Sequence, residues 1–209
     1  MEAVKTFLWK HRWAVFVFLG FTVVKILEAT LRIEFIVASA YVGIILLSLS
    51  LVPPYFKSLG VIARHKRHLG IAAGIILIVH GYTGFSLYLG GDVAQIWQKA
   101  ILPAEIIQIV LIAMLATSGA WPQKKLGLSG WKTIHAAIWA AIPLAFMHAY
   151  LVVQKFEGVI HYPSLVILGG LFLFAVWKLV FLPHPDRKQD VLMLATGSIL
   201  ACLIFFTLP

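Results

Sequence analysis

The sequence predicts an all-α integral membrane protein, with a bundle of six helices and a seventh transmembrane helix at the C-terminus. Of its 209 residues, 61% are hydrophobic and only 12% are charged, and the mean hydropathy is +0.96. A soluble domain is nearer half apolar and about a quarter charged. The apolar residues gather in runs close to the roughly 20 residues that a helix needs to cross a bilayer. Composition and run length together therefore place the chain in a membrane.

We expect the transmembrane helices to follow the apolar runs in order. The first run is retained rather than cleaved, because Val24-Lys25-Ile26-Leu27-Glu28 offers no small-residue cleavage site for a signal peptidase. Lys25 and Glu28 interrupt this run, so the first span is marginal, as is the last. No loop exceeds about a dozen residues, so residues 1–209 are expected to form a single membrane domain. The predicted spans are 12–28, 35–56, 69–90, 101–120, 131–153, 163–182 and 191–208.

The net charge of +9 reflects membrane orientation rather than nucleic-acid binding, because the basic residues lie in alternate short loops. By the positive-inside rule, the N-terminus is cytoplasmic and the C-terminus external in a multi-pass inner-membrane protein. The single cysteine, Cys202, excludes a disulfide framework and a Cys₄ metal site. The basic residues assigned to the cytoplasmic side are Lys5, Lys10, Arg12, Lys57, Arg64, Lys66, Arg67, Lys124, Lys125, Lys132, Lys178, Arg187 and Lys188.

Three histidines lie well within the predicted spans and are the candidate functional residues. His135 and His148 are thirteen residues apart in the fifth span, which is about 20 Å along a helix. His80 lies in the third span, at a depth close to that of His148 and on a helix of the same direction. Two imidazoles at matched depth can hold the iron of a b-type haem. For each histidine, a hydrogen-bonded residue in the protein core is the alternative interpretation.

The sequence also allows a second haem site at the depth of His135. Its other ligand would come from the start of the third span, where His65 lies closer to the face of His80 and His68 is better placed in depth. Pro143 is expected to kink the fifth helix and re-aim its two ends. Haem propionates would find basic partners at this level, although lipid headgroups or topology explain the same charges. These basic candidates are Lys66, Arg67, Lys125 and Lys132.

The order of these motifs matches a known pattern. Arg67-His68-Leu69-Gly70 is followed ten residues later by His80, and Lys125-Leu126-Gly127 precedes Trp131-Lys132-Thr133-Ile134-His135, with His148 thirteen residues on. Over roughly residues 10–182 this order resembles the ferric-reductase-like transmembrane domain family, and within it the MsrQ (YedZ) branch of haem-bearing membrane subunits. The span 191–208 is additional to that family core.

The resemblance implies a six-helix core with haem ligands on the third and fifth helices. His80 and His148 match the outer haem pair, and His135 matches the inner histidine of the fifth helix. Two-haem relatives carry an inner histidine on the third helix, where this chain has Lys66, fourteen residues before His80. MsrQ-like proteins similarly carry a basic residue there, so an inner haem would depend on His65 or His68. The loop after Gly127 is one residue longer than in the MsrQ pattern.

We expect a membrane cytochrome with haem b that passes electrons across the membrane, as the electron-transfer subunit of an oxidoreductase and without catalytic side chains of its own. The sequence carries no G-x-G-x-x-G motif or Rossmann unit, so the electrons come from a separate reductase, a quinol or a flavin bound at the cytoplasmic loops. The external acceptor is a partner reductase, a metal chelate or oxygen, and the resemblance favours a periplasmic partner reductase. The alternatives are a histidine-lined transporter of protons or metal, which the lack of further intramembrane carboxylates disfavours, and a non-catalytic membrane anchor.

Overall fold

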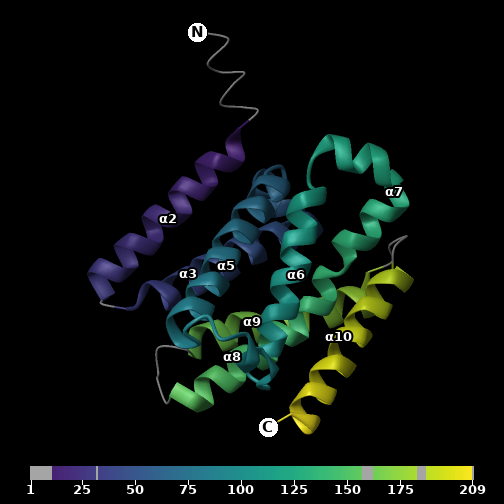
Figure 1. The fold of residues 1–209 in the computed structure, drawn as a ribbon. Helices are drawn as coiled ribbons and strands as arrows, with labels where there is room; N and C mark the ends of the chain where they lie inside the picture. Colours follow the sequence, from purple (N-terminus) through teal and green to yellow (C-terminus); the bar gives the residue numbers. More distant parts are fainter. Residues whose placement is uncertain (1–10, 32, 157–161, 183–186, 209) are drawn as a thin grey trace. The chain divides into compact units, whose positions relative to one another are not determined.

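A computed structural model describes residues 11–31, 33–156, 162–182 and 187–208, and these residues are helical or lie in short turns (Figure 1). Six helices in this part of the chain are long and apolar enough to cross a membrane, which confirms the predicted all-α membrane fold. The fourth predicted span, α6 (Leu102–Thr117), is shorter, with 16 residues. The chain divides into two compact units after His80. Of the residues discussed above, Lys5 and Lys10 lie outside the described part.

The first unit contains three long helices that share one apolar core. They are α2 (Arg12–Leu31), α3 (Phe35–Leu51) and the part of α5 (Lys66–Tyr88) that ends at His80. Between α3 and α5 the chain forms the short turns η1 (Pro53–Tyr55) and η2 (Lys57–Leu59) and the single-turn helix α4 (Gly60–Ala63). The core consists of Val24, Ile33, Ala38, Val42 and Ile76.

Two features of the first unit follow directly from its sequence. The helix α3 ends before Pro53 and Pro54, because a proline cannot donate the backbone hydrogen bond that continues a helix. The charges that interrupt the first apolar run stay within α2, where Lys25 Nζ lies 2.7 Å from Glu28 Oε2 on the exposed surface. The first span is therefore one uninterrupted helix.

The second unit is built around α8. It begins with the end of α5, continues through η3 (Val93–Trp97), α6 and α7 (Ala120–Ala136), and ends with α8 (Ile138–Phe156), α9 (Tyr162–Phe181) and α10 (Arg187–Thr207). The helices α6, α9 and α10 all pack against α8. At the start of the unit, Gly81 leaves room for the side chain of Gln108 of α6 against α5. The core consists of Leu144, Met147, Leu151, Ala201 and Ile204.

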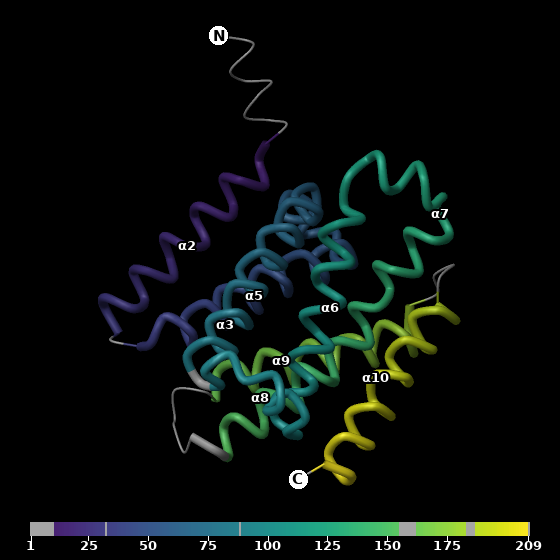
Figure 2. The backbone as a smooth tube through the Cα atoms, in the orientation of Figure 1, coloured from purple at the N-terminus to yellow at the C-terminus, as the bar shows by residue number. Residues whose placement is uncertain are grey.

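The segment predicted as a loop before the fifth span is helical, with one sharp turn. In α7 the backbone leaves the helical region at Gly127, whose φ of 70° suits a glycine because it has no Cβ. Figure 2 shows the resulting turn in the α7 tube. The fifth span, expected as one helix over 131–153, is also interrupted at Ala137, between His135 and His148. Pro143, where a kink was expected, lies inside α8.

Candidate functional site

His148 lies on α8 and is anchored through one ring nitrogen. Its Nδ1 is 2.6 Å from the carbonyl oxygen of Ala100, a residue just before α6. A carbonyl oxygen can only accept, so His148 Nδ1–H is the donor. In the neutral ring, the lone pair then lies on Nε2. His148 is thus held in the tautomer in which Nε2 can bind a metal.

His80 has the same kind of anchor in the other unit. Its Nδ1 lies 2.8 Å from the carbonyl oxygen of Ile36, in the first turn of α3. The same reasoning gives an Nδ1–H donor and a lone pair on Nε2. A ligating histidine commonly donates its second ring N–H to a backbone carbonyl, which fixes the ring and raises its basicity. Each of the two rings, His80 in the first unit and His148 in the second, therefore has the donor chemistry of a histidine that can bind a haem iron.

His135 has the opposite arrangement. Its Nε2 lies 3.3 Å from Thr117 Oγ1, at the C-terminal end of α6. The Thr117 hydroxyl donates its only hydrogen over the shorter distance of 2.8 Å to the Ala113 carbonyl oxygen, so its oxygen accepts from His135 Nε2–H. The neutral ring then carries its lone pair on Nδ1. The alternative of a hydrogen-bonded core histidine fits this geometry.

Trp131 makes the surroundings of His135 more rigid. The indole and imidazole rings stack with their centroids 4.2 Å apart. The Trp131 Nε1–H group donates to the Thr117 carbonyl oxygen at 3.1 Å. Thr117 therefore receives one hydrogen bond from each of the two stacked rings. This cluster joins α7 to the end of α6.

His65 and His68 lie together at the start of α5. Their ring centroids are 6.3 Å apart, and both rings lie beside Phe16 of α2, at 5.7 and 6.5 Å. The Nδ1 atoms of both are buried and have no hydrogen-bond partner among the residues that the structure describes. The neighbouring Lys66 and Arg67 are exposed. These four residues belong to the first unit, whereas His135 belongs to the second.

Within each unit, the histidines lie at two separate levels. In the second unit, His135 contacts the last residue of α6 while His148 contacts a residue just before its first turn. In the first unit, His68 and His80 are twelve residues apart on α5, which is about 18 Å along the helix. Lys132, the remaining predicted site residue, is half-buried on α7 near His135.

A buried ion pair in the second unit was not predicted from the sequence. Lys178 Nζ lies 2.6 Å from Asp190 Oδ2 and 4.1 Å from the centroid of the Trp139 ring, and only 3% and 8% of the two charged side chains is exposed. Lys178, assigned to the cytoplasmic side at the end of the predicted span 163–182, belongs to the last turn of α9 and is buried. Asp190 lies in the first turn of α10. Opposite charges at facing ends of consecutive helices are the signal that would have indicated this pair.

Comparisons with known proteins find one distant relative. No protein-family model matches the chain, and no solved structure matches it. The protein-methionine-sulfoxide reductase heme-binding subunit MsrQ of Caulobacter vibrioides is 27% identical to this chain over 128 residues. The match covers 56% of this chain and 58% of MsrQ, so the chain spans little more than half the length of that relative. The chain is a multi-pass, all-helical membrane protein with a distant MsrQ-like relationship.

Proposed function

We propose that this chain is a haem-binding membrane protein that transfers electrons, in which His80 and His148 would hold the iron of one haem b. The observation that carries the proposal is the shared anchoring of the two rings. Each donates Nδ1–H to a backbone carbonyl oxygen, at 2.8 Å for His80 and 2.6 Å for His148. Each therefore offers Nε2 to a metal. The relative MsrQ is a heme-binding subunit, which supports the same assignment.

The protein residues and the haem have separate roles in this proposal. The haem supplies reversible one-electron chemistry at its iron. The carbonyl oxygens of Ile36 and Ala100 orient the two imidazoles and increase their electron donation through the Nδ1–H bonds. Apolar helices around the ligands exclude water, which lowers the local dielectric constant and helps to set the redox potential.

We further propose that the electron donor and acceptor are separate molecules. The donor is a reductase, a quinol or a flavin at the cytoplasmic face of the inner membrane. The relative is a subunit of a protein-methionine-sulfoxide reductase, so the acceptor proposed for this chain is a partner reductase on the external side. The N-terminus is then cytoplasmic, as the distribution of basic residues predicts.

The proposal assigns one haem rather than two. His135 donates Nε2–H to Thr117 and stacks on Trp131, so its role in this proposal is to hold α7 against α6. With one haem, neither His65 nor His68 is needed as a ligand for a second iron. In this proposal the basic residues Lys66, Arg67 and Lys132 set the membrane orientation and do not bind haem propionates.

Single histidine substitutions test the ligand assignment. We expect His148→Ala and His80→Ala each to abolish the low-spin spectrum of a haem with two imidazole ligands, because one axial ligand is lost. We expect His135→Ala to keep this spectrum and the haem content. The measurements are electron paramagnetic resonance of the oxidised protein and haem content per chain. An unchanged spectrum in His148→Ala, or loss of haem in His135→Ala alone, would overturn the assignment.

A further inference from the structure

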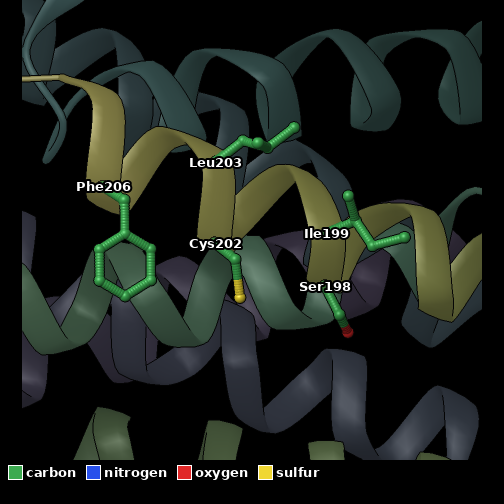
Figure 3. A pocket seen from close by; sticks show the side chains of 5 residues that line it. All are labelled: Ser198, Ile199, Cys202, Leu203 and Phe206. Atoms are coloured by element: carbon green, nitrogen blue, oxygen red, sulfur yellow. The ribbon is translucent and has the colours of Figure 1, made fainter.

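The seventh helix has one continuous buried stripe. Its buried residues follow one another at intervals of four, three, four and three, which is the spacing of a helix packed along its length against a neighbour. They are Asp190, Leu194, Gly197, Ala201 and Ile204. The opposite side of α10 is open: Figure 3 shows an exposed groove there lined by Ser198, Ile199, Cys202, Leu203 and Phe206. One face of α10 is therefore buried against the other helices of the second unit.

Successive residues of α10 contact successive residues of α7 and α8. Near the start of α10, Gln189 Nε2–H donates to Thr133 Oγ1 at 2.8 Å. Further along, Gly197 lies against Ala140. Ala201 and Ile204 then pack with Leu144, Met147 and Leu151 of α8. Residue numbers rise together on the two sides, so α10 runs parallel to α8.

Gly197 sets how closely the two helices approach. A Cβ atom at this position would lie 2.6 and 2.8 Å from the Cα and carbonyl carbon of Ala140, and closer still to its carbonyl oxygen. These are backbone atoms of α8, so they cannot move aside as a flexible side chain can. Any residue larger than glycine at position 197 would push α10 away from α8.

The end of this contact lies on the part of α8 that carries His148. Leu144 lies one turn before His148 and Leu151 lies one turn after it, and both pack against Ala201 and Ile204 of α10. Ala100, whose carbonyl oxygen accepts the hydrogen bond from His148 Nδ1–H, packs against the same cluster. The helix α10 thus supports both the turn that carries the imidazole and the residue that orients it.

The other end of α10 is fixed by the buried ion pair. Asp190 bonds Lys178 of α9, and Lys178 also lies over the Trp139 ring of α8. A buried carboxylate paired in this way holds the start of α10 at one position relative to α8 and α9. The ion pair therefore fixes the start of the same helix whose other end packs near His148.

We propose that α10 is the positioning element for the ligand His148, with Gly197, Ala201 and Ile204 as its positioning residues. This inference rests on the proposed function. It assigns a role in haem ligation to a helix that lies outside the six-helix core expected from the resemblance. Loss of this support lets the His148 ring move relative to Ala100, which weakens both the Nδ1–H bond and the bond from Nε2 to a metal.

A matched pair of substitutions on α10 tests the proposal. Ile204 is 4% exposed and belongs to the buried cluster with Leu144 and Leu151 of α8, whereas Ile199 is 61% exposed on the open side of the same helix. We expect Ile204→Ala to lower haem affinity roughly tenfold, as loss of an outer partner of a metal ligand does. We also expect part of the reduced haem to bind carbon monoxide, because a displaced His148 vacates an axial position. Ile199→Ala should match the wild type in both measurements.

A second matched pair of substitutions is made at glycines, and it is measured on the protein without haem as well as with it. Gly197→Ala meets the Ala140 backbone, whereas a Cβ at Gly170 in α9 meets nothing within 4 Å. We expect Gly197→Ala to bind carbon monoxide like Ile204→Ala, and to lower the thermal midpoint of the apoprotein in detergent. Gly170→Ala should do neither. Where Ile204→Ala does not fold, Ile204→Val removes a single methyl group and gives the same readout at smaller amplitude.

The outcomes separate the two proposals. A wild-type protein that takes up no haem overturns the proposed function and this inference with it. A wild type that binds haem, with carbon monoxide binding absent from Ile204→Ala and Gly197→Ala, overturns the inference alone. An equal effect in Ile199→Ala and Ile204→Ala would also overturn it, because the effect would then not depend on the buried face.

Discussion

The two ring nitrogens of an imidazole can have different partners, and the histidines of this protein differ in which nitrogen bonds the protein. His80 and His148 use Nδ1 to bond the protein, whereas His135 uses Nε2. The spacing of the residues predicted that His135 and His148 lie at different depths. It could not predict which nitrogen each ring uses, because the carbonyl partners of His80 and His148 lie 44 and 48 residues away in the chain. Such partners are set by packing between helices and leave no periodic pattern.

The hydrogen bond between His135 and Thr117 gives a prediction for a single residue. Thr117→Val keeps the shape of the side chain but leaves His135 Nε2–H without its acceptor. We expect a loss of about 1 kcal/mol in the free energy of unfolding, the usual net contribution of one hydrogen bond, because the bond between Thr117 and His135 is part-buried. The haem spectrum should not change, because His135 is not a ligand in the proposal. Denaturant unfolding in detergent measures the first quantity.

Thr30→Val is the matched control for this prediction. The Thr30 hydroxyl is exposed and donates only to the Ile26 carbonyl oxygen of its own helix. We expect its effect to stay within about 0.5 kcal/mol, as for most surface substitutions. A Thr117→Val protein as stable as Thr30→Val would contradict the hydrogen-bonded role of His135.

Individual helices show where sequence patterns were sufficient and where they were not. The long apolar runs predicted α2, α3, α5, α9 and α10 because a run of about 20 apolar residues in a membrane protein has little alternative to a helix. The helix α7 was missed because its first half carries Lys124 and Lys125 and resembles a charged loop. The ion pair of Lys178 was missed because its partner Asp190 is on the next helix.

The ion pair between Lys178 and Asp190 gives a prediction about α9 and α10. Asp190→Asn leaves the Lys178 cation buried without its counter-charge, and we expect a loss of about 3–5 kcal/mol in stability. The double variant Lys178→Met with Asp190→Leu removes both charges and should recover most of this loss, because the burial of unpaired charge is avoided. Thermal or denaturant unfolding measures both. A double variant less stable than Asp190→Asn would contradict the role of charge burial.

The turn within α7 gives a prediction that depends on backbone conformation alone. Gly127 has a φ of 70°, and nothing lies within 4 Å of a Cβ placed there, so the cost of Gly127→Ala comes from the left-handed backbone. We expect a loss of about 1–2 kcal/mol. Gly130→Ala in the same helix should be neutral or stabilising by up to about 1 kcal/mol, since its nearest neighbour would be Leu126 Cβ at 3.6 Å. Equal effects would contradict the assigned turn.

The molecule as a whole has the surface of a protein solvated by lipid. Large apolar side chains are exposed on several helices, including Phe18 of α2 at 71%, Val166 of α9 at 72% and Phe206 of α10 at 80%. A monomeric soluble protein rarely exposes apolar surface so extensively. Composition alone predicted this property, because it depends on the number of apolar residues and not on their contacts. The identities of the donor and the acceptor depend on other molecules, so they stay predictions.

At this scale the central claim is that the whole chain binds one haem b through two histidines. The most direct test is the optical spectrum and haem content of the full-length protein, purified in detergent from haem-sufficient cells. We expect a Soret band, sharp α and β bands on reduction with dithionite, and one haem per chain. A colourless protein would contradict the proposed function, and two haems per chain would contradict the non-ligand role given to His135.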